Sequence, residues 1–155
     1  MAGGYFLAQT GPYLTVVAPG ADPEGDGFPT IVGNGRADIV FGVSVVPQNQ
    51  SLNRWINPAA FAIPPNNVGR GPTSPVGSVV GTGTQSLSLS LFKAFVVREG
   101  IRFQIGGAAA NLLNHPNYTT PNLTYGTPAF GTITNVQTQE NGGPRSLQLT
   151  ARVTF

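Results

Sequence analysis

The last ten residues of the chain alternate without exception between apolar and polar side chains, and this pattern limits the possible folds more than any other. The apolar positions all carry odd numbers, and each is preceded by a polar residue; they are Leu147, Leu149, Ala151, Val153 and Phe155. Successive side chains of a β-strand point to opposite faces of a sheet. The pattern therefore predicts a strand over residues 146–155 that has one apolar face and an aromatic end.

Two segments upstream show the same period of two and predict a β-hairpin. Residues 85–97 and 101–111 are the two expected strands, and residues 98–100 (Arg-Glu-Gly) are the expected turn. If Val97 lies opposite Ile101, the apolar side chains of both strands fall on one face, as a correct register requires. The residues predicted on this face are Leu87, Leu89, Leu91, Phe95, Ile101, Phe103 and Ile105.

The remaining chain is rich in turn-forming residues. Glycine and proline supply 35 of the 155 positions (21 + 14). We expect one more strand over residues 4–17, kinked at Pro12, because proline cannot donate to a ladder. The residues between the strands form two long irregular loops, 18–84 and 112–145, and loops of such length are usually either functional or disordered.

The alternating strands fit either a soluble β-sandwich or a barrel whose apolar face meets lipid. Their lengths of 10 to 13 residues match a strand that crosses a bilayer, whereas sandwich strands average about 5–6 residues. The combination of one tight turn with very long loops is typical of outer-membrane barrels. We therefore predict an all-β fold in which antiparallel hairpins form part of a transmembrane β-barrel wall. Residues 1–155 are expected to form a single segment of this wall, with two long irregular extracellular loops. The polar face, with Arg102, Gln104 and Arg152, is expected to line the lumen.

Composition argues against several other classes of protein. The eight basic residues are scattered and form no basic run, so we expect no nucleic-acid partner. The chain lacks cysteine, which excludes thiol catalysis and thiolate metal sites. Its one histidine, His115, has no partner nucleophile or carboxylate nearby in the sequence. We accordingly predict no enzyme activity, no catalytic residue and no cofactor.

Two small groups of loop residues are candidate sites. Asp22, Glu24 and Asp26 resemble the start of a calcium-binding loop, but Gly33 stands where such a loop needs glutamate. These acids are therefore weak metal candidates, and solvated loop acids are the preferred interpretation. Trp55 and Phe61 could contact a ligand or anchor their loop, and we favour anchoring because aromatic pairs commonly pin long loops.

Five stretches, in order, resemble the final part of Oar-like TonB-dependent outer-membrane receptors of acidobacterial type. They are LNRWINPAAF (52–61), LSLSLFK (87–93), NLLNHPNY (111–118), YGTPAF (125–130) and the aromatic carboxy-terminal strand. The resemblance implies the last four strands of a barrel of about twenty-two. It also implies that outer-membrane lipid surrounds the wall, that the barrel-insertion machinery recognises the strand ending at Phe155, and that TonB acts only through a plug domain absent here.

Two functions remain open at this point. In one, the chain is the C-terminal wall and loop segment of such a receptor, located in the bacterial outer membrane, with the rest of the barrel and the plug supplied elsewhere. In the other, it is a complete short subunit that self-assembles through open strand edges into a multichain barrel, tube or surface filament. The start Met1-Ala2-Gly3-Gly4 lacks the features of a signal peptide, so we expect a natural start further upstream in the first case. The sequence names no transported ligand.

Overall fold

The computed structural model describes residues 1–27, 35–138 and 142–155, and these residues form two compact units. The first, which we call the wall unit, contains Met1–Thr10, Gly83–Tyr118 and Val136–Phe155. The second, the loop unit, contains Gly11–Thr82 and Thr119–Asn135. Among the described residues, no helix is both long enough and apolar enough to cross a membrane.

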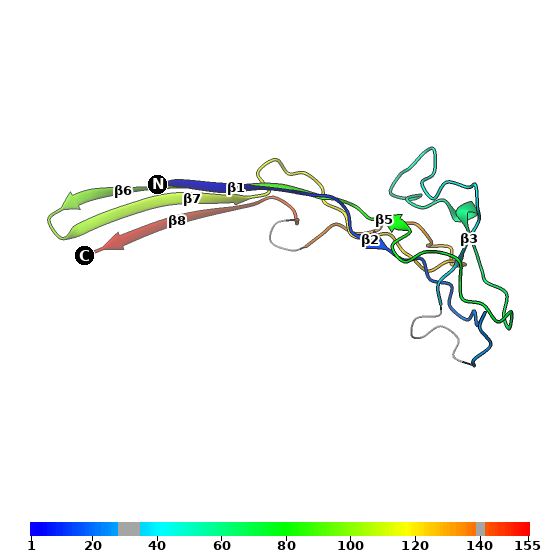
Figure 1. Ribbon diagram of the computed structural model, residues 1–155. Helices are drawn as coiled ribbons and strands as arrows, with labels where there is room; N and C mark the ends of the chain where they lie inside the picture. Colours follow the sequence, from blue (N-terminus) through cyan, green and yellow to red (C-terminus); the bar gives the residue numbers. More distant parts are fainter. Residues whose placement is uncertain (28–34, 139–141) are drawn as a thin grey trace. The chain divides into compact units, whose positions relative to one another are not determined.

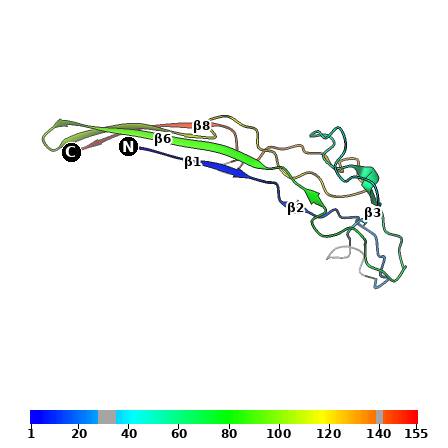
Figure 2. The same ribbon diagram turned by 45° about the horizontal axis from the view of Figure 1, so that its top comes forward.

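The wall unit is a four-stranded antiparallel sheet. Its strands are β1 (Ala2–Gln9), β6 (Thr84–Arg98), β7 (Ile101–Ala110) and β8 (Ser146–Thr154), and their order in the sheet is β1-β6-β7-β8. They run side by side along most of their length (Figures 1 and 2). The predicted all-β, antiparallel fold class is therefore confirmed, and three of the four expected strands begin and end within one residue of their predicted bounds.

The register brings the apolar rows of three strands together on one face. Phe95 pairs with Phe103, and Phe103 pairs with Val153. Directly paired residues of an antiparallel sheet project to the same side. With a side-chain period of two, these pairs place the odd-numbered positions of β6, β7 and β8 on a common face up to the hairpin turn.

The hairpin turn differs from the prediction. Val97 does not pair with Ile101; a β-bulge between Val96 and Arg98 leaves Arg98 opposite Ile101. Only Glu99 and Gly100 then remain as the connection, and Gly100 adopts the left-handed φ of 81° that such a tight turn uses. Because the bulge inserts one extra residue, it moves Arg98 onto the face that Phe95 occupies.

The segment 4–17 is two strands in two different sheets rather than one kinked strand. β1 ends at Gln9, and β2 (Tyr13–Leu14) pairs with β5 (Val79–Val80) in the loop unit. Gly11 lies against the backbone of Gly81 so closely that a Cβ atom would collide with it. This close approach, together with the missing N–H of Pro12, ends the first strand.

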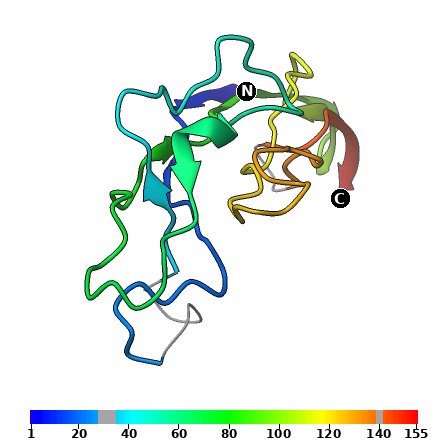
Figure 3. The ribbon, with the colours of Figure 1, turned by 90° about the vertical axis from the view of Figure 1, so that its right-hand side faces the viewer.

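The long loops form a folded unit rather than irregular chain. β3 (Asp38–Ile39) pairs with β4 (Phe61–Ala62), directly after the 3₁₀-helix η1 (Pro58–Ala60), and Figure 3 shows this arrangement. Apolar side chains from both loop segments meet in a core; its buried members are Val16, Ala18, Ala21, Ala37, Ile56, Ala60, Phe61 and Val79. The loop unit therefore has a hydrophobic core of its own.

Candidate functional site

The apolar face of the wall unit is uncovered. Leu91, Ile105 and Leu149 are exposed to 66%, 50% and 90%. All the fully buried apolar side chains among the described residues belong to the loop unit, so the wall leucines lie in no core. A soluble sandwich would bury these side chains against a second sheet. The wall face is thus an apolar surface that needs an apolar environment.

The same face contains a shallow apolar groove. Gly107 and Ala109 of β7 form part of its lining, and the leucines of β6 and β8 stand on either side; they are Leu89, Leu91, Leu147 and Leu149. Its volume is about 750 Å³. A Cβ atom on Gly107 would stand 3.4 Å from a methyl group of Leu149, an ordinary packing distance. The small residues Gly107 and Ala109 therefore form the floor of the groove, and the strands remain in packing contact around it.

The opposite face of the wall is mainly polar. Gln104 pairs with Arg152, and Arg102 pairs with Thr154, so all three residues expected in the lumen lie on this face. The hydroxyl groups of Ser86 and Ser88 lie here too, buried and without a hydrogen-bond partner in the described part of the chain. One face apolar and the other polar is the pattern of a membrane barrel wall.

Both outer strands of the sheet have an open edge. Among the described residues, β8 pairs with β7 alone, and β1 pairs with β6 alone. On β6 the pairing with β1 reaches only to Leu91, followed by a bond from the Met1 amine to the Phe92 carbonyl (2.8 Å). Four strands do not close a barrel, since small closed barrels have about eight. A closed wall therefore needs strands from outside this sheet.

A family model of outer membrane β-barrel domains matches residues 1–148. The chain belongs to the outer membrane β-barrel domain family. This membership agrees with the two contrasting faces and the open edges of the wall, and it gives the chain a structural role in an outer-membrane barrel. A search of curated proteins and a search of solved structures each found no match.

In this family member, the end of the wall that carries the long loops is held by two buried asparagines. The Asn117 amide accepts a hydrogen bond from the Gln85 N–H (2.7 Å) and donates one to the Gln85 carbonyl (3.0 Å). Asn111 donates to the carbonyls of His115 and Gly143 (2.9 and 2.8 Å). The Asn117 side chain thus takes the place of a strand neighbour at Gln85, whereas Asn111 joins the turn at His115 to Gly143. Sequence reasoning missed them, although the dense asparagines of residues 111–117 were a possible signal.

The loop residues Trp55 and Phe61 both hold the loop unit together in the structure. The indole N–H of Trp55 donates to the Val80 carbonyl (2.9 Å). Phe61 is buried, and its ring stands 6.5 Å from that of Tyr125 and 6.0 Å from that of Phe130. The contact with Phe130 is edge-to-face, and aromatic contacts of this kind add to the burial energy. The geometry is that of anchors.

A hydrogen-bonded ion pair that the sequence did not suggest is centred on Asp38, the first residue of β3. Asp38 forms a two-pronged ion pair with Arg70, with oxygen–nitrogen distances of 2.7 and 3.1 Å. It also accepts hydrogen bonds from the backbone and hydroxyl of Thr73 (2.8 and 3.1 Å). The bond from Arg70 is the main cause that lowers the pKa of Asp38, and burial opposes it. All these contacts are internal, so they fix the 70–73 segment onto β3.

The weak metal candidates are not brought together as ligands. The Asp22 carboxylate accepts hydrogen bonds from the backbone N–H groups of Gly25, Asp26 and Gly27 (2.9, 3.3 and 3.0 Å). In the described part of the chain, no group of three or more acidic or histidine side chains is placed to hold a metal ion. Gly33 lies outside the described residues. Asp22 therefore shapes its own turn.

His115 lies in the asparagine-rich turn at the loop-bearing end of the wall. Its ring nitrogen Nδ1 stands 3.3 Å from the Asn117 side-chain oxygen, and its backbone N–H donates to Asn111 (3.1 Å). These contacts are those of a turn residue.

The side chain of the carboxy-terminal residue Phe155 is 97% exposed.

Proposed function

We propose that the chain is the C-terminal portion of an Oar-like TonB-dependent outer-membrane receptor, where it supplies part of the wall and the extracellular loops. The observation that carries this proposal is the wall itself, which has one bare apolar face, one polar face and two open edges. The five sequence stretches that resemble those receptors support the finer assignment. Active uptake would belong to the whole receptor, since the four strands of the wall do not by themselves close a barrel.

In this function the tight turn faces the periplasm and the loop unit faces the outside. Outer-membrane barrels have short periplasmic turns and long extracellular loops. The turn at Glu99–Gly100 joins β6 and β7, whereas the segments between β1 and β6 and between β7 and β8 are long. Because β1, β6, β7 and β8 run alternately up and down, the segment after β1 and the segment after β7 both leave the wall at the same end.

Single-cysteine labelling tests this orientation cleanly, because the chain has no cysteine of its own. Asn53→Cys in the loop unit and Glu99→Cys in the turn are both at exposed positions. On intact cells, a membrane-impermeant maleimide should label the first variant and leave the second unlabelled. After the cells are opened, both should react. Labelling of Glu99→Cys on intact cells would contradict the orientation.

A second candidate function is self-assembly through the open edges, and the unpaired edge of β8 is the observation that favours it. A photo-crosslinking amino acid at position 149, which is 90% exposed, distinguishes the two functions. A receptor should crosslink within one polypeptide or to an upstream barrel strand. Self-assembly should instead give a ladder in steps of 16.1 kDa, the mass of the chain.

A further inference from the structure

Lys93 is an exception on the apolar face of the wall. It stands in the row of odd-numbered β6 positions, two residues after Leu91 and two before Phe95, and it pairs with the apolar Ile105. A charged side chain in contact with acyl chains costs about 2–4 kcal/mol at mid-membrane and much less near the interface. The Lys93 ammonium lies 5.3 Å from the centre of the Phe95 ring, the next residue of the row toward the tight turn. The side chain thus points to that end of the wall.

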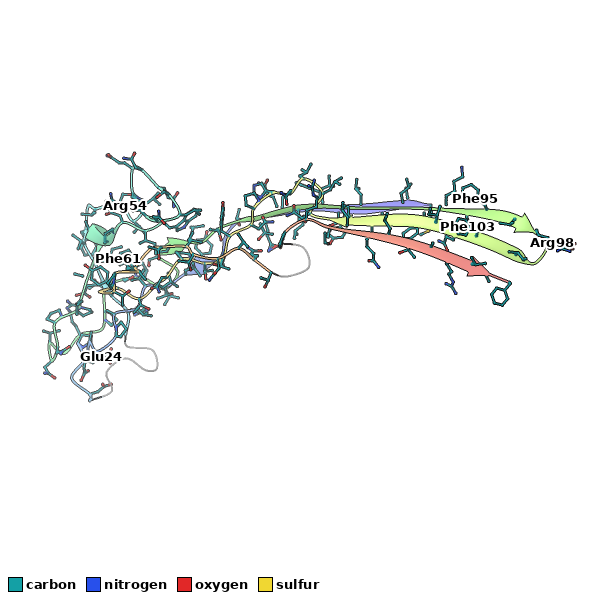
Figure 4. All side chains as sticks on the ribbon, turned by 180° about the vertical axis from the view of Figure 1, so that it is seen from behind. Glu24, Arg54, Phe61, Phe95, Arg98 and Phe103 are labelled. Carbon is teal, nitrogen blue, oxygen red and sulfur yellow. The ribbon has the colours of Figure 1, made fainter. Side chains whose placement is uncertain are left out.

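A second cation joins this row because of the β-bulge. Arg98 pairs with Ile101, which shares its face with Phe103, so Arg98 lies on the apolar side of the wall. Figure 4 shows Phe95, Phe103 and Arg98 gathered at the tight-turn end. We call Lys93, Phe95 and Arg98 the basic aromatic patch.

The two cations of the patch form no ion pair with another described residue. Among the described residues the one ion pair is between Arg70 and Asp38, in the loop unit. Glu99 is the single acidic side chain described in the wall unit, and it lies in the turn without an ion pair to Lys93 or Arg98. An aromatic ring between two cations at the rim of an apolar surface matches a lipid whose headgroup carries a phosphate.

We propose that the basic aromatic patch binds the phosphate headgroup of an anionic phospholipid at the membrane surface next to the tight turn. The Lys93 stem runs along the apolar surface and carries its ammonium to the headgroup level. Arg98 contacts the same phosphate layer from the turn, and Phe95 lies at the boundary with the acyl chains. In the orientation given above, on which the choice of leaflet rests, this surface is the inner leaflet of the outer membrane.

Lipid selectivity tests the proposal. The protein is assembled in vesicles that contain phosphatidylcholine and phosphatidylglycerol in both leaflets, and the lipids retained after extraction are counted by native mass spectrometry. The unaltered protein should retain phosphatidylglycerol preferentially. Lys93→Gln and Arg98→Gln should each reduce this preference by about fivefold, the factor for one cation near an anionic surface.

Arg152→Gln is the matched control, because it removes the same charge from the opposite face of the wall. It should leave the preference unchanged. Three results would each overturn the proposal. The unaltered protein could show no preference for phosphatidylglycerol, Lys93→Gln and Arg98→Gln could leave that preference unchanged, or Arg152→Gln could reduce it equally. Folding of each variant is verified by its heat-modifiable mobility in gels, and Lys93→Arg should restore the preference if it folds.

The result does not depend on the direction in which the wall is inserted, since both vesicle leaflets have the same composition. A failure of the orientation appears in the Glu99→Cys labelling, whereas a failure of the lipid site appears only in the retained lipids. The two outcomes are therefore distinguishable.

Discussion

The ring of Phe92 covers Gly106, its directly paired neighbour across β6 and β7. A Cβ atom added to Gly106 would overlap three carbon atoms of that ring. The aromatic ring thus occupies the space that the missing side chain leaves and shields the glycine backbone of the strand. This contact lies on the face opposite to the leucine rows.

Gly106→Ala should destabilise the wall by about 1–3 kcal/mol, because the new methyl group forces Phe92 out of its position. Gly107→Ala is the matched control: its Cβ would meet Leu149 at an ordinary packing distance, so its effect should be small. Urea titration of the folded form measures both. In a Phe92→Ala background the cost of Gly106→Ala should fall, and an undiminished cost there would show that the ring is not the cause.

Asn117→Ala should weaken the junction at the loop-bearing end of the wall by about 2–4 kcal/mol. The side chain is 1% exposed, and its loss leaves both the N–H and the carbonyl of Gln85 without their partners. Hydrogen exchange of the Gln85 amide should accelerate strongly. Gln148→Ala, at an exposed position of β8, serves as the control and should not change that exchange rate.

The Asp38–Arg70 contact should make the loop unit sensitive to acid. The folded-state pKa of Asp38 lies below its ordinary value of 3.8, so the carboxylate stabilises the fold above about that pH. This stabilisation is lost as the pH falls from 3.8 through the lowered pKa. Hydrogen exchange of the Thr73 amide, corrected for intrinsic rates, should report the loss. Asp38→Asn should remove the acid dependence, and its persistence in that variant would assign it to another group.

Leu149→Arg should impair membrane insertion by about 2–4 kcal/mol if residue 149 lies near mid-membrane, whereas Thr150→Arg on the polar face should be tolerated. Both positions are exposed neighbours on β8, and they occupy opposite faces of the wall. The measurement is the folded fraction in phospholipid vesicles titrated with denaturant. Equal effects at the two positions would refute the assignment of the odd-numbered row to lipid.

Phe155→Ser should slow assembly into the outer membrane in cells while leaving the stability of the assembled barrel nearly unchanged. The Phe155 side chain is 97% exposed and supports no packing in the wall. Its proposed role is recognition by the insertion machinery. Pulse-labelling of cells, followed over time by heat-modifiable mobility, separates the assembly rate from stability. A loss of stability with an unchanged rate would assign Phe155 a packing role instead.

Sequence alone determined three of the four strands of the wall and which of their residues share a face. Alternation is a local property: once Leu147 to Phe155 and Leu87 to Leu91 are read with a period of two, the faces follow from strand geometry. Phe95 pairs with Phe103, as a register with Val97 opposite Ile101 implies, because the bulge between Val96 and Arg98 offsets a turn that is one residue shorter than expected.

Tertiary structure decided what local pattern does not encode. The bulge that moves Arg98 to the apolar face depends on how the hairpin closes. The hydrogen bonds between the Asn117 side chain and the Gln85 backbone join residues 32 positions apart. The core around Phe61 also needs both loop segments, whose many turn-forming residues and scattered apolar residues show no regular period in the sequence. Period and composition specify a strand, but a contact between distant segments depends on three-dimensional packing that no single segment contains.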